Sequence, residues 1–192
     1  MAESKEDSIT DAQFATNSPV IPLQNPLWDH ACQVYSQVGV EAELLVLQDN
    51  HGADINLILQ ALWLASEGIE WTPECIPEDY QPWVTEQVIP IRNIRRRLKT
   101  DWVEKRGVAY EGFRQQVKKL ELQAEQYALA ILYVHNATNS SGVKKKATKI
   151  KGVNAKGASK SVPVFLAEDN LKRLGESMNI LPEHFHSLIT TL

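Results

Sequence analysis

The sequence predicts an all-α protein: an irregular multi-helix bundle with a central buried helix, one long helix and a tethered pair of C-terminal helices. Three observations support this fold class. Residues Ile55 to Glu67 are apolar almost all the way round a helix, as is typical of a helix that is covered on several sides. Apolar residues from Tyr110 to Val134 recur in alternating steps of three and four, which indicates a long amphipathic helix. Finally, a lysine-rich stretch without acidic residues, 136–161, sets two short amphipathic segments apart from the rest.

The chain begins with a polar stretch and then a helix-opening signal. Residues 1–20 are polar and rich in small side chains, so we predict a disordered tail there and a helical bundle domain over residues 21–135. The tail lacks the apolar core of a signal peptide. Asn25 and Pro26 supply a capping side chain followed by a proline in the first turn, and we expect a helix from there to about Gln37.

Two apolar helices joined by a tight polar corner form the next segment. The first is expected over Glu41–Asn50, and Gly52 ends it because glycine adopts the left-handed conformation without a steric clash. Asp54 is a natural N-cap, since its carboxylate can accept hydrogen bonds from the free backbone amides of the next turn. The second helix runs over Ile55–Glu67. Its thirteen residues are too few to span a bilayer, which requires about 20.

Side chains able to hydrogen-bond or to ligate gather around this corner: Gln48, Asp49, His51, Asp54, Asn56 and Gln60. In a structural interpretation, Asp54 caps its helix, while Asn56 and Gln60 share one helix face and bond neighbouring backbone in the interior. In a functional interpretation, the six residues are a candidate ligand-binding site, rich in the oxygen atoms that Mg²⁺ and Ca²⁺ prefer. There is no EF-hand spacing and no second histidine at helical distance for zinc, so no metal site is assigned and no cofactor is predicted.

A loop with several prolines follows Gly68, with Trp71 and Ile76 as the expected anchors to the core. Helix resumes over Tyr80–Val88, and Pro90 kinks or restarts it because proline lacks the amide hydrogen that the helix needs.

One face of the continuing helix is basic: Arg92, Arg95, Arg96, Arg97 and Lys99. Such a run is usually a solvated helix face or is paired with acidic residues of neighbouring helices. The alternative is contact with phosphate or nucleic acid, although no aromatic platform or recognition motif accompanies the run.

The long helix is expected over Ala109–His135 and would measure roughly 40 Å. Its apolar seam raises the question of a dimeric coiled coil, but the flanking positions lack the alternating charges that set coiled-coil pairing. Toward its end, Ala128, Leu129 and Leu132 broaden the apolar face. A wide face favours packing inside the bundle over a two-stranded zipper.

Beyond this helix, residues 136–161 read as a flexible basic linker with seven lysines. Lysine tracts can bind nucleic acid or anionic surfaces in a salt-dependent way, but they are more often solvated tethers. Residues 162–192 then form a C-terminal helical hairpin, with helices opened by Pro163 and by Leu181-Pro182. Two such short helices cannot make a core of their own, so we expect them to dock on the bundle or on a protein partner.

Composition restricts the classes of function. The net charge of −4 argues against a general nucleic-acid binder. Cys32 and Cys75 are far apart and follow no metal or redox spacing, which predicts reduced thiols and a cytoplasmic protein. No segment of the sequence resembles a membrane span, and the oligomeric state is not predicted.

The central segment resembles a family of small proteobacterial helical proteins that is catalogued as a domain of unknown function. The resemblance rests on Leu27-Trp28, Gln48-Asp49, Gly52, Asp54, Asn56-Leu57 and Leu62-Trp63. It extends from about Leu27 to Leu132. It implies an all-helical fold and brings no reaction, substrate or partner with it.

The sequence contains no phosphate-binding glycine loop, no nucleophile elbow, no paired-cysteine metal site and no H-E-x-x-H motif. A non-enzymatic adaptor or regulatory interaction protein is therefore the first hypothesis, with the C-terminal helices as the partner surface. The second is a helical enzyme or a protein that binds a ligand or divalent ion at the 49–56 corner. The third is association with nucleic acid through the basic segments.

Overall fold

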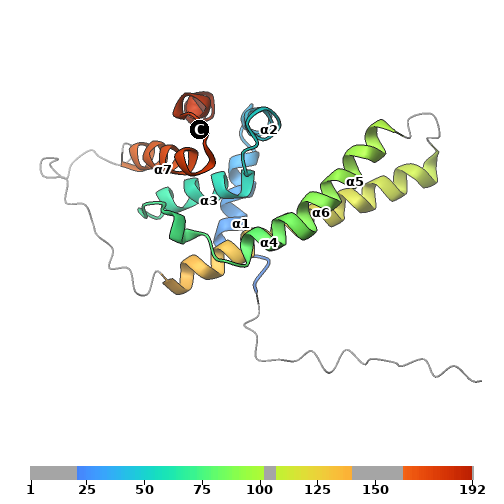
Figure 1. Cartoon of the computed structure of the whole chain (residues 1–192), viewed down its shortest axis with the longest axis horizontal. Coiled ribbons are helices and arrows are strands. Elements are labelled where there is room, and N and C mark those ends of the chain that lie inside the picture. The colour runs from blue at the N-terminus through green and yellow to red at the C-terminus, as the bar shows by residue number, and fades with distance from the viewer. Residues whose placement is uncertain (1–20, 102–106, 140–161, 192) are drawn as a thin grey trace, which may run out of the picture.

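The computed structural model describes residues 21–101, 107–139 and 162–191, and within these residues every regular element is helical (Figure 1). This confirms the predicted all-α class. The helices are α1 (Pro26–Tyr35), α2 (Val40–His51), α3 (Ile55–Ser66), α4 (Tyr80–Trp83), α5 (Ile89–Thr100), α6 (Val108–Asn139), α7 (Val162–Met178) and α8 (His186–Thr191). The predicted tail, 1–20, and most of the predicted basic linker lie outside the described residues. No described helix combines the length and the apolar character that crossing a membrane requires.

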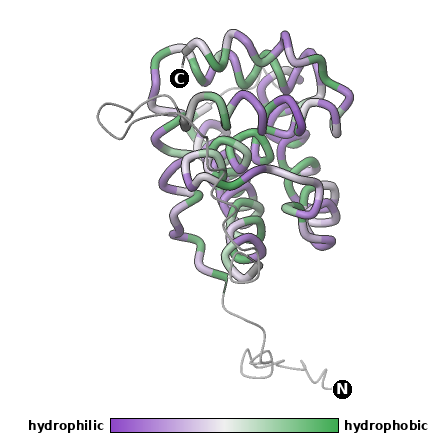
Figure 2. The backbone as a smooth tube through the Cα atoms, turned by 90° about the vertical axis from the view of Figure 1, so that its left-hand side faces the viewer, coloured by the Kyte–Doolittle hydropathy of each residue, from purple (hydrophilic) through white to green (hydrophobic). Residues whose placement is uncertain are grey.

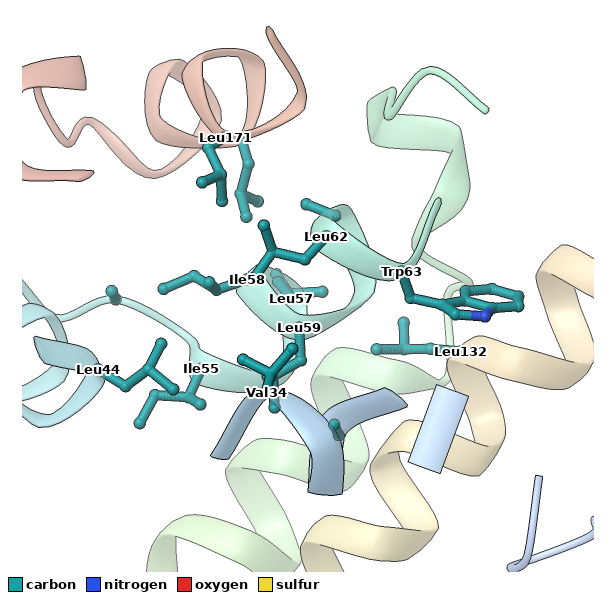
Figure 3. Close-up of a cluster of buried hydrophobic side chains, with 14 of the residues drawn as sticks. Val34, Leu44, Ile55, Leu57, Ile58, Leu59, Leu62, Trp63, Leu132 and Leu171 are labelled. Atoms are coloured by element: carbon teal, nitrogen blue, oxygen red, sulfur yellow. The ribbon is translucent and has the colours of Figure 1, made fainter. Parts of the chain in front are cut away.

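Helix α3 is the centre of the fold. Every residue from Ile55 to Ala65 is buried, and α3 packs against α1, α2, α6 and α7. Figure 3 shows Val34, Leu44, Leu132 and Leu171 of those four helices around the apolar side chains of α3. The prediction that this helix lies in the middle of the bundle is confirmed, because an all-apolar helix surface can be removed from water only by neighbours on every side.

The local signals at the helix ends act as expected. Asn25 accepts a hydrogen bond from the backbone amide of Trp28 at 3.0 Å, and so caps α1. Gly52 ends α2 with φ of 69°, and the amide of Ala53 bonds back to the carbonyl oxygen of Leu47 at 3.1 Å. These contacts satisfy backbone groups that a helix end leaves without partners.

Helix α6 is long enough to contact both the core of the bundle and the projecting helix α5. Its C-terminal part packs under α1 and α3, whereas its N-terminal part runs alongside α5 and projects with it from the rest of the molecule in Figure 1. The helix continues to Asn139, past the point at which the linker was expected to begin. Asn136 explains this extension: it is buried, and its amide donates to the carbonyl oxygens of Leu132 at 2.7 Å and Cys75 at 3.1 Å.

The C-terminal helices dock on the bundle. Leu171 and Leu174 of α7 are fully buried in the main core, as is Leu188 of α8. In Figure 2, α7 and α8 lie across one end of the molecule, and hydrophilic residues alternate with hydrophobic ones along the outer helices. The sequence left open whether these helices dock on the bundle or on a protein partner. In the structure, α7 buries its apolar face against the bundle.

Candidate functional site

The corner between α2 and α3 forms one wall of a cleft. Gly52 and Ala53 turn the chain, and Asp54 begins α3 by accepting the amide hydrogen of Asn56 at its Oδ1 atom, at 3.0 Å. The first turn of α3 therefore presents Asp54, Asn56 and Leu57 at the cleft. These positions follow from local sequence, since the glycine and the capping aspartate act within a few residues.

The facing wall comes from a π-helical turn, Val84–Val88, between α4 and α5. The amide of Ile89 bonds to the carbonyl oxygen of Val84, five residues back, immediately before Pro90. Proline has no amide hydrogen and its ring crowds the preceding turn, so the wider π turn lets the helix pass Pro90 without ending. Turns of this kind occur frequently at functional sites.

The cleft between these walls has a volume of about 340 Å³. Its residues come from the α2–α3 corner, α3, α4, the π turn, α5 and α7: Gly52, Ala53, Asp54, Asn56, Leu57, Gln81, Val84, Val88, Ile89, Arg92 and Met178. Apolar residues are the more numerous in the lining, whereas Asp54, Asn56, Gln81 and Arg92 supply hydrogen-bonding groups. This volume is at the lower end of the range found for small-molecule sites.

Asp54 and Tyr80 form the polar centre of the site. Tyr80 is fully buried, and its hydroxyl group donates to Asp54 Oδ2 at 2.9 Å. Burial raises the pKa of the Asp54 carboxyl, and the bonds from Tyr80 and Asn56 offset this only in part. Burial also raises the pKa of Tyr80, and the neighbouring Asp54 carboxylate raises it further. Both shifts reflect the cost of placing a negative charge in a poorly hydrated region.

Arg92 brings a positive charge to the same cleft. Its Nη2 atom donates to Glu125 of α6 at 2.6 Å, and its Nε atom lies 3.4 Å from Glu121. Glu121 also pairs with Arg95. Two arginines and two glutamates thus form a compact network between α5 and α6, and its net charge is zero when all four are ionised.

The structure brings only part of the predicted corner site together. Asp54 and Asn56 line the cleft, whereas Gln60 faces the loop after α3, where it donates to the Cys75 carbonyl oxygen at 2.8 Å and accepts from Trp71 Nε1 at 3.3 Å. Gln60 therefore makes the backbone bond that the structural interpretation predicted.

The other three corner residues lie on α2, outside the cleft. Asp49 is exposed and pairs with Arg96 at 2.6 Å, and the ring of His51 stacks on that of His184 with 3.9 Å between centroids. Gln48 is half-buried. Among the described residues, no group of three or more His, Cys, Asp or Glu side chains is placed to hold a metal ion.

The predicted basic run is divided among several acidic partners. Arg92 and Arg95 pair with α6, Arg96 pairs with Asp49, and Arg97 lies 3.5 Å from Asp101. Lys99 is exposed. Arg92 alone of these residues lines the corner cleft.

Sequence reasoning missed Tyr80, Gln81 and Met178 as site residues. The only available signal for the first two was Pro90, which predicted an irregular helix in their vicinity but not a π turn. Met178 reaches the cleft from the end of α7, 124 positions after Asp54 in the numbering, and no local pattern pointed to it.

Comparison with known proteins assigns the family. A family model described as "Protein of unknown function (DUF2390)" matches residues 26–132, which includes both walls of the cleft except Met178. No curated protein and no solved structure matches the chain. Because the match covers more than half of the 192 residues, the chain belongs to this family of proteins of unknown function.

Proposed function

We propose that this protein binds a small zwitterionic ligand with an apolar side group, of the size of a free amino acid, in the corner cleft. The observation that carries the proposal is the placement of Asp54 and Arg92, together with apolar side chains, on the lining of one cleft. An ammonium group would bind at Asp54, a carboxylate at Arg92, and the apolar group against Val84, Val88 and Met178.

The carboxyl of Asp54 has unused bonding capacity. The carboxylate accepts hydrogen bonds from the amides of Asn56 and Leu57 and from the Tyr80 hydroxyl, which is fewer than the four lone pairs of its two ionised oxygens. Burial disfavours its charge in the free protein, as the raised pKa of Asp54 indicates. A bound ammonium group would add to the counter-charge that Arg92 already provides and return the pKa of Asp54 toward its ordinary value, which would strengthen binding.

Arg92 also has N–H donors that could bind a ligand. A guanidinium group carries five N–H donors, and Glu121 and Glu125 occupy only some of those of Arg92. Because these glutamates already balance its charge, the site favours a single carboxylate over a phosphate or another polyanion. The same charge balance disfavours nucleic acid as an occupant of this cleft.

Binding can be tested by thermal shift and titration calorimetry with four probes: leucine, methionine, isopentylamine and 4-methylpentanoate. A ligand that binds only the folded state raises the melting temperature, by the equivalent of about 2.7 kcal/mol at a hundred times its dissociation constant. We expect the amino acids to bind more tightly than the amine or the acid, each of which lacks one charged group.

Asp54→Asn is the matched variant, because asparagine keeps the helix cap and the shape while removing the charge. It should abolish amino-acid binding, whereas Asp49→Asn on the neighbouring helix should leave it unchanged. No stabilisation by any of the four probes would rule out the proposal.

A second surface favours the interaction-protein hypothesis. A shallow groove of about 580 Å³ lies between α7 and the turn that leads into α8, with Leu171, Phe185 and Ile189 as apolar lining and Glu168, Asp169 and Glu183 among its polar residues. Its composition would suit a basic amphipathic peptide.

Fluorescence polarisation with a lysine-rich amphipathic peptide tests this second function. Binding should weaken with added salt and be lost in Glu168→Lys, while Glu176→Lys, an exposed α7 site that does not line the groove, serves as the control. Equal binding by both variants would contradict it.

A further inference from the structure

The arm formed by α5 and the N-terminal part of α6 has an apolar side that nothing in the described chain covers. Helix α5 packs against α6 and against the π turn that precedes it, and the two helices project together in Figure 1. A two-helix hairpin buries only the surface between its helices, so each helix keeps an outward face.

The seam of α6 shows which face this is. Val117 and Ala124 are buried, at 8% and 6% exposure. The alternate seam positions, Phe113 and Leu120, are 52% and 51% exposed. In the C-terminal half the corresponding residue, Tyr127, is covered by Trp83, whose ring centroid lies 4.3 Å away. The apolar seam is therefore covered by neighbouring residues within the bundle, whereas along the arm only alternate positions are covered.

Helix α5 contributes to the same side. The hydroxyl group of Tyr110, on the α6 seam one turn before Phe113, donates to the carbonyl oxygen of Leu98, which places Leu98 beside the seam. Ile94 lies one turn before Leu98 on α5 and is 49% exposed. The Arg92–Glu125 and Arg95–Glu121 pairs fix how α5 and α6 face each other, and with this orientation the helical register puts Ile94, Leu98, Phe113 and Leu120 on one side of the hairpin. We call this stripe the arm face.

Most charges of the arm are paired with one another, including Asp101, which lies two turns after Ile94 and pairs with Arg97. Arg92, Arg95, Glu121 and Glu125 neutralise one another between the helices, and Arg96 pairs with Asp49 on the side toward α2. The seam residues of α6 are flanked by the uncharged amides Gln116 and Gln123. A surface without net charge can meet an identical copy of itself without like-charge repulsion, whereas it offers a charged partner little complementarity.

We propose that the arm face binds the arm face of a second copy of this chain. Two hairpins related by a twofold axis would pack into a four-helix bundle, in which Phe113, Leu120 and Ile94 become core residues. This arrangement differs from a two-stranded coiled coil of α6 alone, since α5 already occupies one flank of the seam. A contact limited to this stripe would be at the low end of the size range of stable complexes, which implies a dimer that dissociates in the micromolar range.

Sedimentation velocity and light scattering on the full chain, from about 1 to 300 μM, test the proposal across the range in which such dimers dissociate. The mass should rise from monomer to dimer over this range. Leu120→Glu and Ile94→Glu, on different helices, should each weaken the association at least tenfold. Both positions are half-exposed, so the fold should persist, and circular dichroism and melting temperature verify this.

Leu122→Glu is the matched control. Leu122 is 52% exposed, like Leu120, but two residues further along the helix places it on nearly the opposite side of α6. It should leave the dimer unchanged. A monomer at every concentration would overturn the proposal and leave the arm face to another segment or partner. So would a dimer that Leu120→Glu and Ile94→Glu leave intact, or one that Leu122→Glu weakens equally.

Discussion

Tyr80 donates its hydroxyl hydrogen to Asp54 across 2.9 Å, beside the cleft between α3 and the π turn. The bond joins residues 26 positions apart. It connects a helix cap to the first turn of α4, so the same carboxylate that begins α3 also positions the opposite wall of the cleft.

The pH dependence of stability should reveal the half-buried carboxyl of Asp54. Its pKa is raised above the ordinary value of 3.8, mainly by burial. Between 3.8 and the folded-state pKa, the folded protein holds a proton that the unfolded chain has lost, so this residue's contribution to stability falls as pH rises through that window. Asp54→Asn removes this titration. The free energy of unfolding of the variant, relative to that of the parent, should therefore be higher at pH 7 than at pH 4. Urea denaturation at several pH values measures this, and parallel curves would contradict it.

Tyr80→Phe should destabilise the protein at neutral pH. The substitution removes the hydroxyl donor and leaves Asp54 with one bond fewer, which costs about 1–3 kcal/mol for a charged acceptor. Loss of the bond also raises the pKa of Asp54 further, so the penalty should shrink at low pH, where the carboxyl is protonated. An equal loss of stability at pH 4 and pH 7 would contradict the view that the bond to the ionised Asp54 carboxylate is what Tyr80 contributes.

Asn170 is expected to hold the C-terminal helices to the core. It is fully buried on α7, accepts from the amide of Trp71 at 2.8 Å and donates to the carbonyl oxygens of Ala61 and Ile69 at 3.1 and 3.0 Å. Asn170→Ala leaves these backbone groups without that partner, and we expect a loss of about 2–3 kcal/mol. The control is Asp169→Ala, an exposed neighbour, which should change little. Hydrogen exchange would localise the effect to α7 and to the loop around Trp71.

Two glycines in helices should respond to alanine in opposite ways. A Cβ atom at Gly175 of α7 would lie 2.8 Å from the Ile180 carbonyl oxygen and 2.8 Å from the Phe185 ring, so Gly175→Ala should destabilise the packing of the turn before α8. Gly112 of α6 has open space at that position, and Gly112→Ala should stabilise the protein by up to about 1 kcal/mol through helix propensity. Thermal denaturation of both variants gives the comparison, and stabilisation by both would mean that Phe185 moves aside freely.

Glu121 should be the most sensitive charged residue of the arm. It is 6% exposed and pairs with both Arg92 and Arg95. Glu121→Ala would leave two partly buried guanidinium groups with less compensation, and we expect a cost of about 2–4 kcal/mol, somewhat below that of a fully buried pair. Glu111→Ala, at an exposed i, i+3 pair with Arg114, should cost well under 1 kcal/mol. Equal losses of stability in Glu121→Ala and Glu111→Ala would contradict a stabilising role of the network between α5 and α6.

Local patterns in the sequence were sufficient for most of the helices. Asn25 with Pro26, Gly52 and Asp54 mark helix ends because a cap acts on backbone groups two or three residues away. The all-round apolar surface of Ile55–Ser66 also determines that α3 is central, since only burial on every side removes it from water. Local patterns did not show the role of Gly175. It lies in the last turn of α7 and provides space for Phe185, while Asn179, just past the helix, takes the left-handed conformation with φ of 57°.

Only the tertiary structure decided how the candidate site is composed. Of the six polar corner residues, Asp54 and Asn56 line the cleft, while Gln60 bonds to the loop and Asp49 pairs with Arg96. Arg92 meets Glu125 across 33 positions, and Asn170 meets Trp71 across 99. The sequence by itself determined where the helices begin, end and expose apolar surface, because those choices depend on interactions within about one turn. Which polar groups meet depends on the direction in which the helices pack, and that is set by the shapes of residues far apart in the chain.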